Sequence, residues 1–205
     1  MWIIYAFGSA FFAGLTAVLA KCGIEHTNSH LATALRTIVV LIFSWIMVGI
    51  VGSFDTIHTI THKTFLFLIL SGISTGASWL CYFKALQLGN INKVTAVDKT
   101  SVVLTIILSL IFFKESVTIY KIIGMIILTT GTYLMVEKKK GTAQTSNAWL
   151  LYAVLSVVFA SLTTILGKIG ITNIESNLGT AIRTSVVLIM SWIVVFVTHS
   201  EMNMK

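Results

Sequence analysis

Long apolar runs restrict the fold of this 205-residue chain more than any other feature. A helix of about 20 apolar residues, rising about 1.5 Å per residue, crosses the ~30 Å hydrocarbon core of a bilayer. Strands of a membrane barrel are only about 10 residues long and alternate in polarity, so runs of this length are expected to be helices. The runs are Trp2–Ala20, Leu31–Gly52, Phe65–Leu88, Val94–Phe113, Ile119–Val136, Trp149–Gly167 and Leu178–Val197. We therefore predict an all-α membrane protein, a helical bundle of about seven transmembrane helices joined by short polar connectors.

Charged residues are scarce, and their distribution suits a lipid environment. They make up 10% of the chain, against roughly a quarter of a soluble domain. The net charge is +7, but the basic residues form no basic face with interleaved aromatic rings, so nucleic acid is not an expected partner. The expected partner is the lipid bilayer of the cell (cytoplasmic) membrane. Near the ends of the runs, Lys21, Lys93, Lys114 and Lys121 are expected to extend to the headgroups.

An internal repeat predicts the organisation of the chain. Residues 149–195 align without a gap on residues 2–48 when the sequence is shifted by 147 positions, and 26 of the 47 positions are identical. The identities include charged and aromatic positions, such as Lys21 with Lys168 and Arg36 with Arg183. Shared hydrophobicity alone would not align these residues.

The position of the second copy predicts that it is inverted. Five runs precede it, and after an odd number of crossings it enters the membrane from the opposite side. Inverted repeats are typical of secondary transporters. We therefore expect a five-helix unit over residues 1–137, a polar linker over 138–148 and a truncated second unit of two helices over 149–205.

Particular residues of the first unit resemble a known family. The stretch from Gly76 to Ser116 reads GASWLCYFKALQLGNINKVTAVDKTSVVLTIILSLIFFKES, and Lys21, Asn28 and the TALRT segment precede it. This pattern resembles the EamA family of the drug/metabolite transporter superfamily. The resemblance implies transport of a small-molecule solute by ten helices, or by two five-helix chains that pair. It also implies that the partner is a second five-helix chain or another copy in a homo-oligomer.

Ionisable residues inside the runs are the first candidates for function. Each costs about 2.5–3.5 kcal/mol to insert on translocon scales, so each needs a structural or functional reason to be there. These residues are Arg36, Lys84, Asp98 and Lys99. Asp98 and Lys99 are adjacent and point ~100° apart on a helix, so we expect the partner of Asp98 to be Lys84 or Arg36 from another helix.

Two helix faces extend this set of candidates. In the fourth run one polar face must meet a neighbouring helix or a water-filled path, because it cannot face lipid. That face comprises Thr95, Asp98, Ser101, Thr105 and Ser109. In the third run Trp79 and Tyr82 either line a substrate cavity or pack between helices. The predicted substrate pathway therefore consists of Arg36, Trp79, Tyr82, Lys84, Asp98, Lys99, Ser101 and Thr105.

No enzyme chemistry is expected from the sequence. Gly72 to Gly76 spells the G-x-S-x-G pattern of serine hydrolases, but it lies inside an apolar helix, away from every histidine. The two glycines serve helix packing, or alternatively a hinge. No motif for a metal or another cofactor is present. We predict transport by alternating access, with Asp98 as the carboxylate for ion or proton coupling. The alternative is a truncated or partner subunit that does not transport alone.

Overall fold

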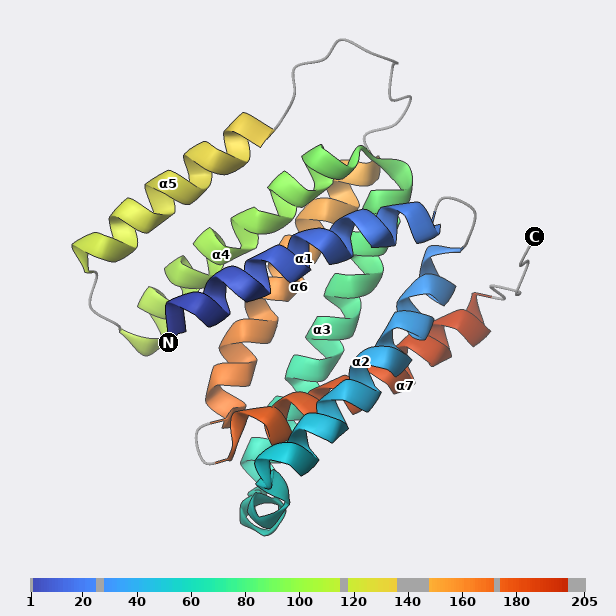
Figure 1. Cartoon of the computed structure of the whole chain (residues 1–205), viewed down its shortest axis with the longest axis vertical. Helices are drawn as coiled ribbons and strands as arrows, with labels where there is room; N and C mark the ends of the chain where they lie inside the picture. Colours follow the sequence, from blue (N-terminus) through green and yellow to red (C-terminus); the bar gives the residue numbers. More distant parts are fainter. Residues whose placement is uncertain (1, 25–27, 115–117, 136–147, 172–173, 199–205) are drawn as a thin grey trace.

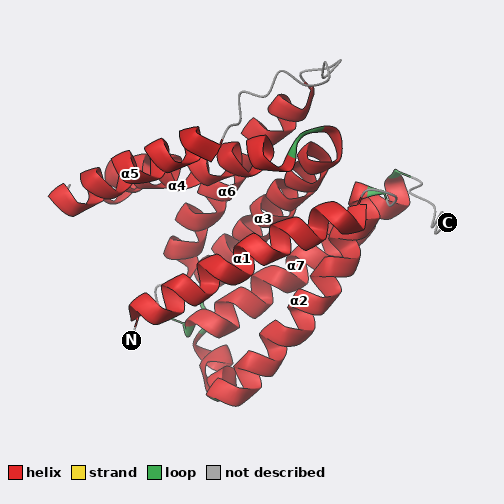
Figure 2. Ribbon diagram, turned by 45° about the horizontal axis from the view of Figure 1, so that its top comes forward, coloured by secondary structure: helices red, strands yellow, loops and turns green. Residues whose placement is uncertain are grey.

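The computed structural model describes residues 2–24, 28–114, 118–135, 148–171 and 174–198. These residues form seven α-helices and one 3₁₀-helix and contain no strand (Figure 2). The helices are α1 (Trp2–Ile24), α2 (Ser29–Val51), η1 (Ser53–Thr59), α3 (His62–Leu88), α4 (Ile91–Phe113), α5 (Ile119–Met135), α6 (Ala148–Gly170) and α7 (Ser176–Val197). Six are long and apolar enough to cross a membrane, and α5 is an apolar helix of 17 residues. The prediction of a helical membrane bundle is confirmed at this level.

Several helices extend beyond the predicted runs, by up to four residues at the end of α1, and the second connector contains an element that the sequence did not predict. Gly52 ends α2 with φ 72°, a left-handed conformation that glycine adopts without a steric penalty. The chain then forms η1, which the sequence did not predict, and α3 begins at His62 rather than Phe65. Of the predicted polar linker, only Ala148 lies within the described residues, where it begins α6.

Helix α6 is central to the packing. It packs alongside α3 over most of its length and also packs against α4 (Figure 1). Helix α7 packs against both α2 and α3. In contrast, α5 packs mainly against α4, and α1 makes small contacts with α2, α3 and α4. Helix α6 of the second repeat copy is therefore more tightly packed than its counterpart α1.

Helices α3 and α7 approach each other closely at two glycines. A Cβ atom added to Gly72 would lie 2.8 Å from Cβ of Val186 and 2.9 Å from the carbonyl oxygen of Arg183. One added to Gly76 would lie 2.7 Å from Sδ of Met190. Glycine at these positions allows the two backbones to approach. The helix-packing interpretation of this glycine pair is confirmed.

The repeat copies begin their second helices in the same way. Asn28 caps α2 by accepting a hydrogen bond from the N–H of His30, and the aligned Glu175 caps α7 by accepting from the N–H groups of Asn177 and Leu178. The carboxylate also accepts from Ser53 Oγ at 2.8 Å. Partial burial acts to raise the pKa of Glu175, but the four hydrogen bonds to its charged form outweigh burial and hold the pKa below its ordinary value.

Two aligned lysines lie near opposite ends of α4. Lys21 Nζ donates hydrogen bonds to the carbonyl oxygens of Leu86, at 2.5 Å, and Gly89, at 3.2 Å, beside the turn into α4. The Lys168 ammonium lies 4.5 Å from the centre of the Phe113 ring, at the last residue of α4. The carbonyls at the end of α3 attract this cation, and the extension of Lys21 to the headgroups stays a prediction.

Candidate functional site

A cavity of about 230 Å³ lies between α1, α2, α3, α4 and α6. Helix α1 contributes only small side chains to its wall, whereas α2, α3 and α4 contribute charged, aromatic and hydroxyl groups. Six of the eight predicted pathway residues line it: Arg36, Trp79, Tyr82, Asp98, Lys99 and Ser101. The fold thus brings residues from three separate helices to one space. Their role in a substrate pathway stays a prediction.

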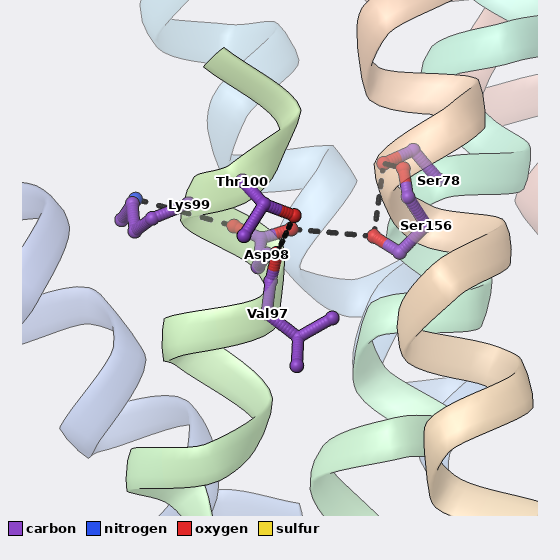
Figure 3. Close-up of polar contacts among 6 residues, drawn as sticks. All are labelled: Ser78, Val97, Asp98, Lys99, Thr100 and Ser156. Atoms are coloured by element: carbon purple, nitrogen blue, oxygen red, sulfur yellow. Dashed lines mark hydrogen bonds and ion pairs between the residues drawn. The ribbon is translucent and has the colours of Figure 1, made fainter. Parts of the chain in front are cut away.

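Asp98 is hydrogen-bonded to α6 and paired with its own neighbour (Figure 3). Ser156 Oγ donates to Asp98 Oδ1 at 3.3 Å, and Ser156 in turn lies 3.2 Å from Ser78 Oγ on α3. On the other side of the carboxylate, Lys99 Nζ lies 4.0 Å from Asp98 Oδ2. The lysine side chain is 47% exposed and the aspartate 24%. This pair is therefore loose and partly exposed.

Lys84 and Arg36 were the two partners predicted for Asp98, and neither pairs with it among the described residues. Lys84 donates instead to Gln87 Oε1 at 3.0 Å on the same helix, and Arg36 lines the cavity without an ion pair to Asp98 among the described residues. The angle between adjacent helix positions did not exclude Lys99, because a flexible four-carbon stem can bend its ammonium toward the neighbouring residue.

Two predicted pathway residues lie outside the cavity lining. Lys84 is near the end of α3, and Thr105 is one turn beyond Ser101 on α4. Thr105 is half-buried and belongs to the polar face of α4, but it does not reach the lined space. The polar face of α4 thus meets the cavity only over part of its length.

Arg36 lies against two aromatic rings of α3. Its guanidinium carbon is 4.5 Å from the centre of the Trp79 ring and 5.5 Å from that of Phe83. These are cation–π distances. Trp79 therefore lines the cavity and also packs against Arg36 of a neighbouring helix. That the cavity holds a substrate stays a prediction.

Hydroxyl groups link α3 to α6 beneath the cavity. Ser71 Oγ donates to the carbonyl oxygen of Thr163 at 2.9 Å, and Thr75 Oγ1 lies 3.3 Å from Thr163 Oγ1. Ser78 Oγ donates to the carbonyl oxygen of Ser156 at 3.1 Å. Sequence reasoning did not identify Ser78 or Ser156 as site residues. The signal was present, because Ser71, Thr75 and Ser78 recur at i, i+4 and i+7 on one face of α3.

A second hollow adjoins the cavity between α1 and α2. Its volume is about 380 Å³, and its lining is mainly apolar. It shares Thr16, Ala20, Arg36 and Phe83 with the first cavity. Arg36 therefore stands between a polar space and an apolar one.

Long apolar helices around a polar, charged cavity define a multi-pass helical membrane protein. Residues 1–137 match the EamA-like transporter family. The chain belongs to this family, within the drug/metabolite transporter superfamily, and is a membrane transporter of that type. Membership points to a transporter rather than an enzyme.

Similar proteins agree with this assignment. The chain is 40% identical over 134 residues to an uncharacterized transporter in the cobO 3′ region of Sinorhizobium sp.. The aligned residues cover 65% of this chain and 95% of that protein. It is 26% identical over 115 residues to the uncharacterized transporter YxxF of Bacillus subtilis, over 55% of this chain and 37% of that protein. An uncharacterized protein of Methanocaldococcus jannaschii is 26% identical over 103 residues, covering 46% of this chain and 75% of that protein. No solved structure matches the chain significantly.

Proposed function

We propose that this protein moves a small metabolite or drug-like solute across the cell membrane by alternating access, through the cavity that contains Arg36 and Asp98. The observation that carries the proposal is the convergence of Arg36, Asp98 and Lys99 on one space, since intramembrane charges are retained mainly where they serve a pathway. Asp98 is the carboxylate proposed for ion or proton coupling. Uptake of a radiolabelled solute panel by proteoliposomes, compared with protein-free liposomes, tests this function.

We further propose that residues 149–205 form an inverted copy of the first two helices, attached to a five-helix unit over residues 1–137. The positions of the two aligned lysines support this. Lys21, near the end of α1, is bonded to the turn between α3 and α4, while Lys168, near the end of α6, contacts Phe113 at the far end of α4. Equivalent helix ends thus lie at opposite ends of one membrane-spanning helix.

Cysteine labelling should place these two helix ends on opposite membrane surfaces. The exposed Cys22, kept as the single cysteine in a Cys81→Ser chain, reports the end of α1. Lys168→Cys in a chain with Cys22→Ser and Cys81→Ser reports the end of α6. An impermeant maleimide added to sealed, uniformly oriented vesicles is expected to label one site before lysis and the other only after lysis. Labelling of both sites from the same side would contradict the inverted repeat.

The alternative function is that of a subunit that transports only with a second five-helix chain. It is favoured by a stripe of small and hydroxyl residues that the two repeat copies share. On α6 the stripe packs against α3 and consists of Ala153, Ser156, Ala160, Thr163, Gly167 and Gly170. The aligned stripe of α1 consists of Ala6, Ser9, Ala13, Thr16, Ala20 and Gly23. It is mostly exposed, and a Cβ added to Gly23 would meet no atom within 4 Å.

The α1 stripe therefore suits a helix that resembles α3. The α3 helix of another identical copy is already covered by its own α6, so a chain without a sixth helix fits better. Such chains exist in the family, because the Sinorhizobium relative is almost fully covered by 134 aligned residues. A homo-oligomer remains the competing assembly, and it requires α6 to move away from α3.

Assembly should depend on the α1 stripe. Ser9→Leu places a bulky side chain in the stripe, away from both hollows, and is expected to lower the fraction of chain that associates in mild detergent, measured by light scattering after gel filtration. Val18→Leu is the matched control, because Val18 is 54% exposed and lies on the opposite side of α1. A parent chain that is a stable monomer and transports alone would contradict the subunit alternative.

A further inference from the structure

Arg36 is a partly buried cation without an anionic partner. Among the described residues it has no hydrogen bond and no ion pair, and it makes cation–π contacts with Trp79 and Phe83. Ring contacts do not replace the hydration that a guanidinium loses on burial, and buried charges are normally paired. The protein thus leaves one positive charge of this cavity for something else to neutralise.

The other charges of the cavity already compensate each other. Asp98 lies 4.0 Å from Lys99 and accepts a hydrogen bond from Ser156. Arg36 is the remaining ionic group of the lining, and the carboxylate that would satisfy it within the chain is engaged elsewhere. The cavity as described therefore carries one net positive charge.

The geometry around Arg36 also indicates the shape of the missing group. The guanidinium carbon lies 4.5 Å and 5.5 Å from the centres of two rings, and no described residue accepts a hydrogen bond from the guanidinium, so its N–H groups are left for a ligand. The N–H edge of a guanidinium matches the two oxygens of a carboxylate, which it binds bidentately. Trp79, Tyr82 and Phe83 then offer ring surface to the body of the same ligand.

We propose that Arg36 is a substrate-binding residue for a small organic monoanion, a carboxylate that carries a flat or aromatic body. This assigns a substrate class to the cavity and rests on the proposed transport function. The anion sits on the N–H edge of Arg36 and the ring lies against Trp79 and Tyr82. The cavity of about 230 Å³ suits one such molecule.

The experiment compares two probes that share a phenyl ring and differ in charge at pH 7. The full chain is placed in nanodiscs of phosphatidylcholine, which has no net charge to compete for Arg36. Binding of 3-phenylpropionate and of 2-phenylethylamine is followed by tryptophan fluorescence. The anion is expected to bind roughly tenfold more tightly or better. Arg36→Gln is expected to remove this preference, and Arg36→Lys to keep part of it as a point charge without the fork.

Arg183→Gln is the matched control, because Arg183 occupies the same repeat position and also has a buried nitrogen without a hydrogen bond among the described residues, but it lies beside Gly167 and does not line the cavity. It should leave the preference for the anion unchanged. Because Arg36→Gln removes both an unpaired charge and the two ring contacts, its unfolding temperature is measured beside binding, and loss of the anion preference in a chain that is still folded supports the proposal.

Three results would overturn the proposal: amine binding as tight as anion binding, a preference for the anion that survives Arg36→Gln, or a folded chain that does not bind 3-phenylpropionate. Binding is measured separately from transport. If the chain binds the anion but moves no solute, the proposed transport function is contradicted and the proposed anion site at Arg36 is not. A chain that transports but prefers the amine overturns only the anion site.

Discussion

Replacing Gly72 with alanine is expected to lower the free energy of unfolding by about 1–3 kcal/mol, the usual cost of overpacking a tight helix contact. The new Cβ would lie 2.8 Å from Cβ of Val186 and 2.9 Å from the carbonyl oxygen of Arg183. Neither atom can move without moving the α7 backbone, so the two helices must separate. Thermal unfolding in detergent, followed by circular dichroism, measures the change.

Two further glycines calibrate this result. Gly76→Ala is expected to be milder, because the nearest atom is Sδ of Met190, which a flexible side chain can carry away. Gly124→Ala on α5 meets no atom within 4 Å and is expected to unfold at or slightly above the parent temperature, since alanine favours helices. If Gly72→Ala unfolds at the same temperature as Gly124→Ala, the close packing of α3 on α7 is wrong.

Asp98→Asn is expected to lower pH-dependent uptake roughly tenfold or more, while the protein stays folded. The change keeps the shape of a protonated carboxyl and removes its charge, so a coupling site can no longer cycle. The structural cost should stay below about 1 kcal/mol, because the pair is loose at 4.0 Å and the Lys99 side chain is 47% exposed. Uptake by proteoliposomes over a pH series, with the solute found in the panel, gives the readout together with the unfolding temperature.

Ser156→Ala separates coupling from positioning. It removes the 3.3 Å hydrogen bond to Asp98 but leaves the carboxyl in place, so uptake should remain pH-dependent. A loss of about 3–5 kcal/mol of stability in Asp98→Asn would instead identify a structural ion pair. Parental uptake at every pH in a stable Asp98→Asn chain would remove Asp98 from the mechanism.

The sequence predicted the composition of the cavity better than the contacts inside it. A charged or hydroxyl group in a membrane helix must avoid lipid, so Arg36, Asp98 and Ser101 were expected to face the interior of the bundle. All three line the same cavity. The partner of Asp98 was missed because helix spacing fixes the direction of Cβ but not the end of a long side chain such as Lys99. The position of Lys84 beside Gln87 depends on a side-chain conformation that no pattern records.

The elements of the fold likewise divide into those that the sequence predicted and those that it did not. Helix number and approximate ends followed from apolar length, and the role of Gly72 from its spacing to Gly76. The 3₁₀-helix Ser53–Thr59 could not be predicted, because it depends on the left-handed turn at Gly52 and on contacts with α7. The hydroxyl contacts of α3 with α6 needed the rotation of each helix about its axis, which the periodicity of one helix leaves free.

The contact between α3 and α6 also sets an order of events during synthesis. Ser71 and Ser78 on α3 bond to α6 residues 92 and 78 positions later in the chain. Inside lipid no hydrophobic force draws these helices together, so polar contacts and close packing must do so. While the ribosome is still making α4 and α5, α3 is therefore already in the membrane without its partner. The inserted helices should stay loosely associated until α6 emerges, and α6 then closes the bundle around the cavity.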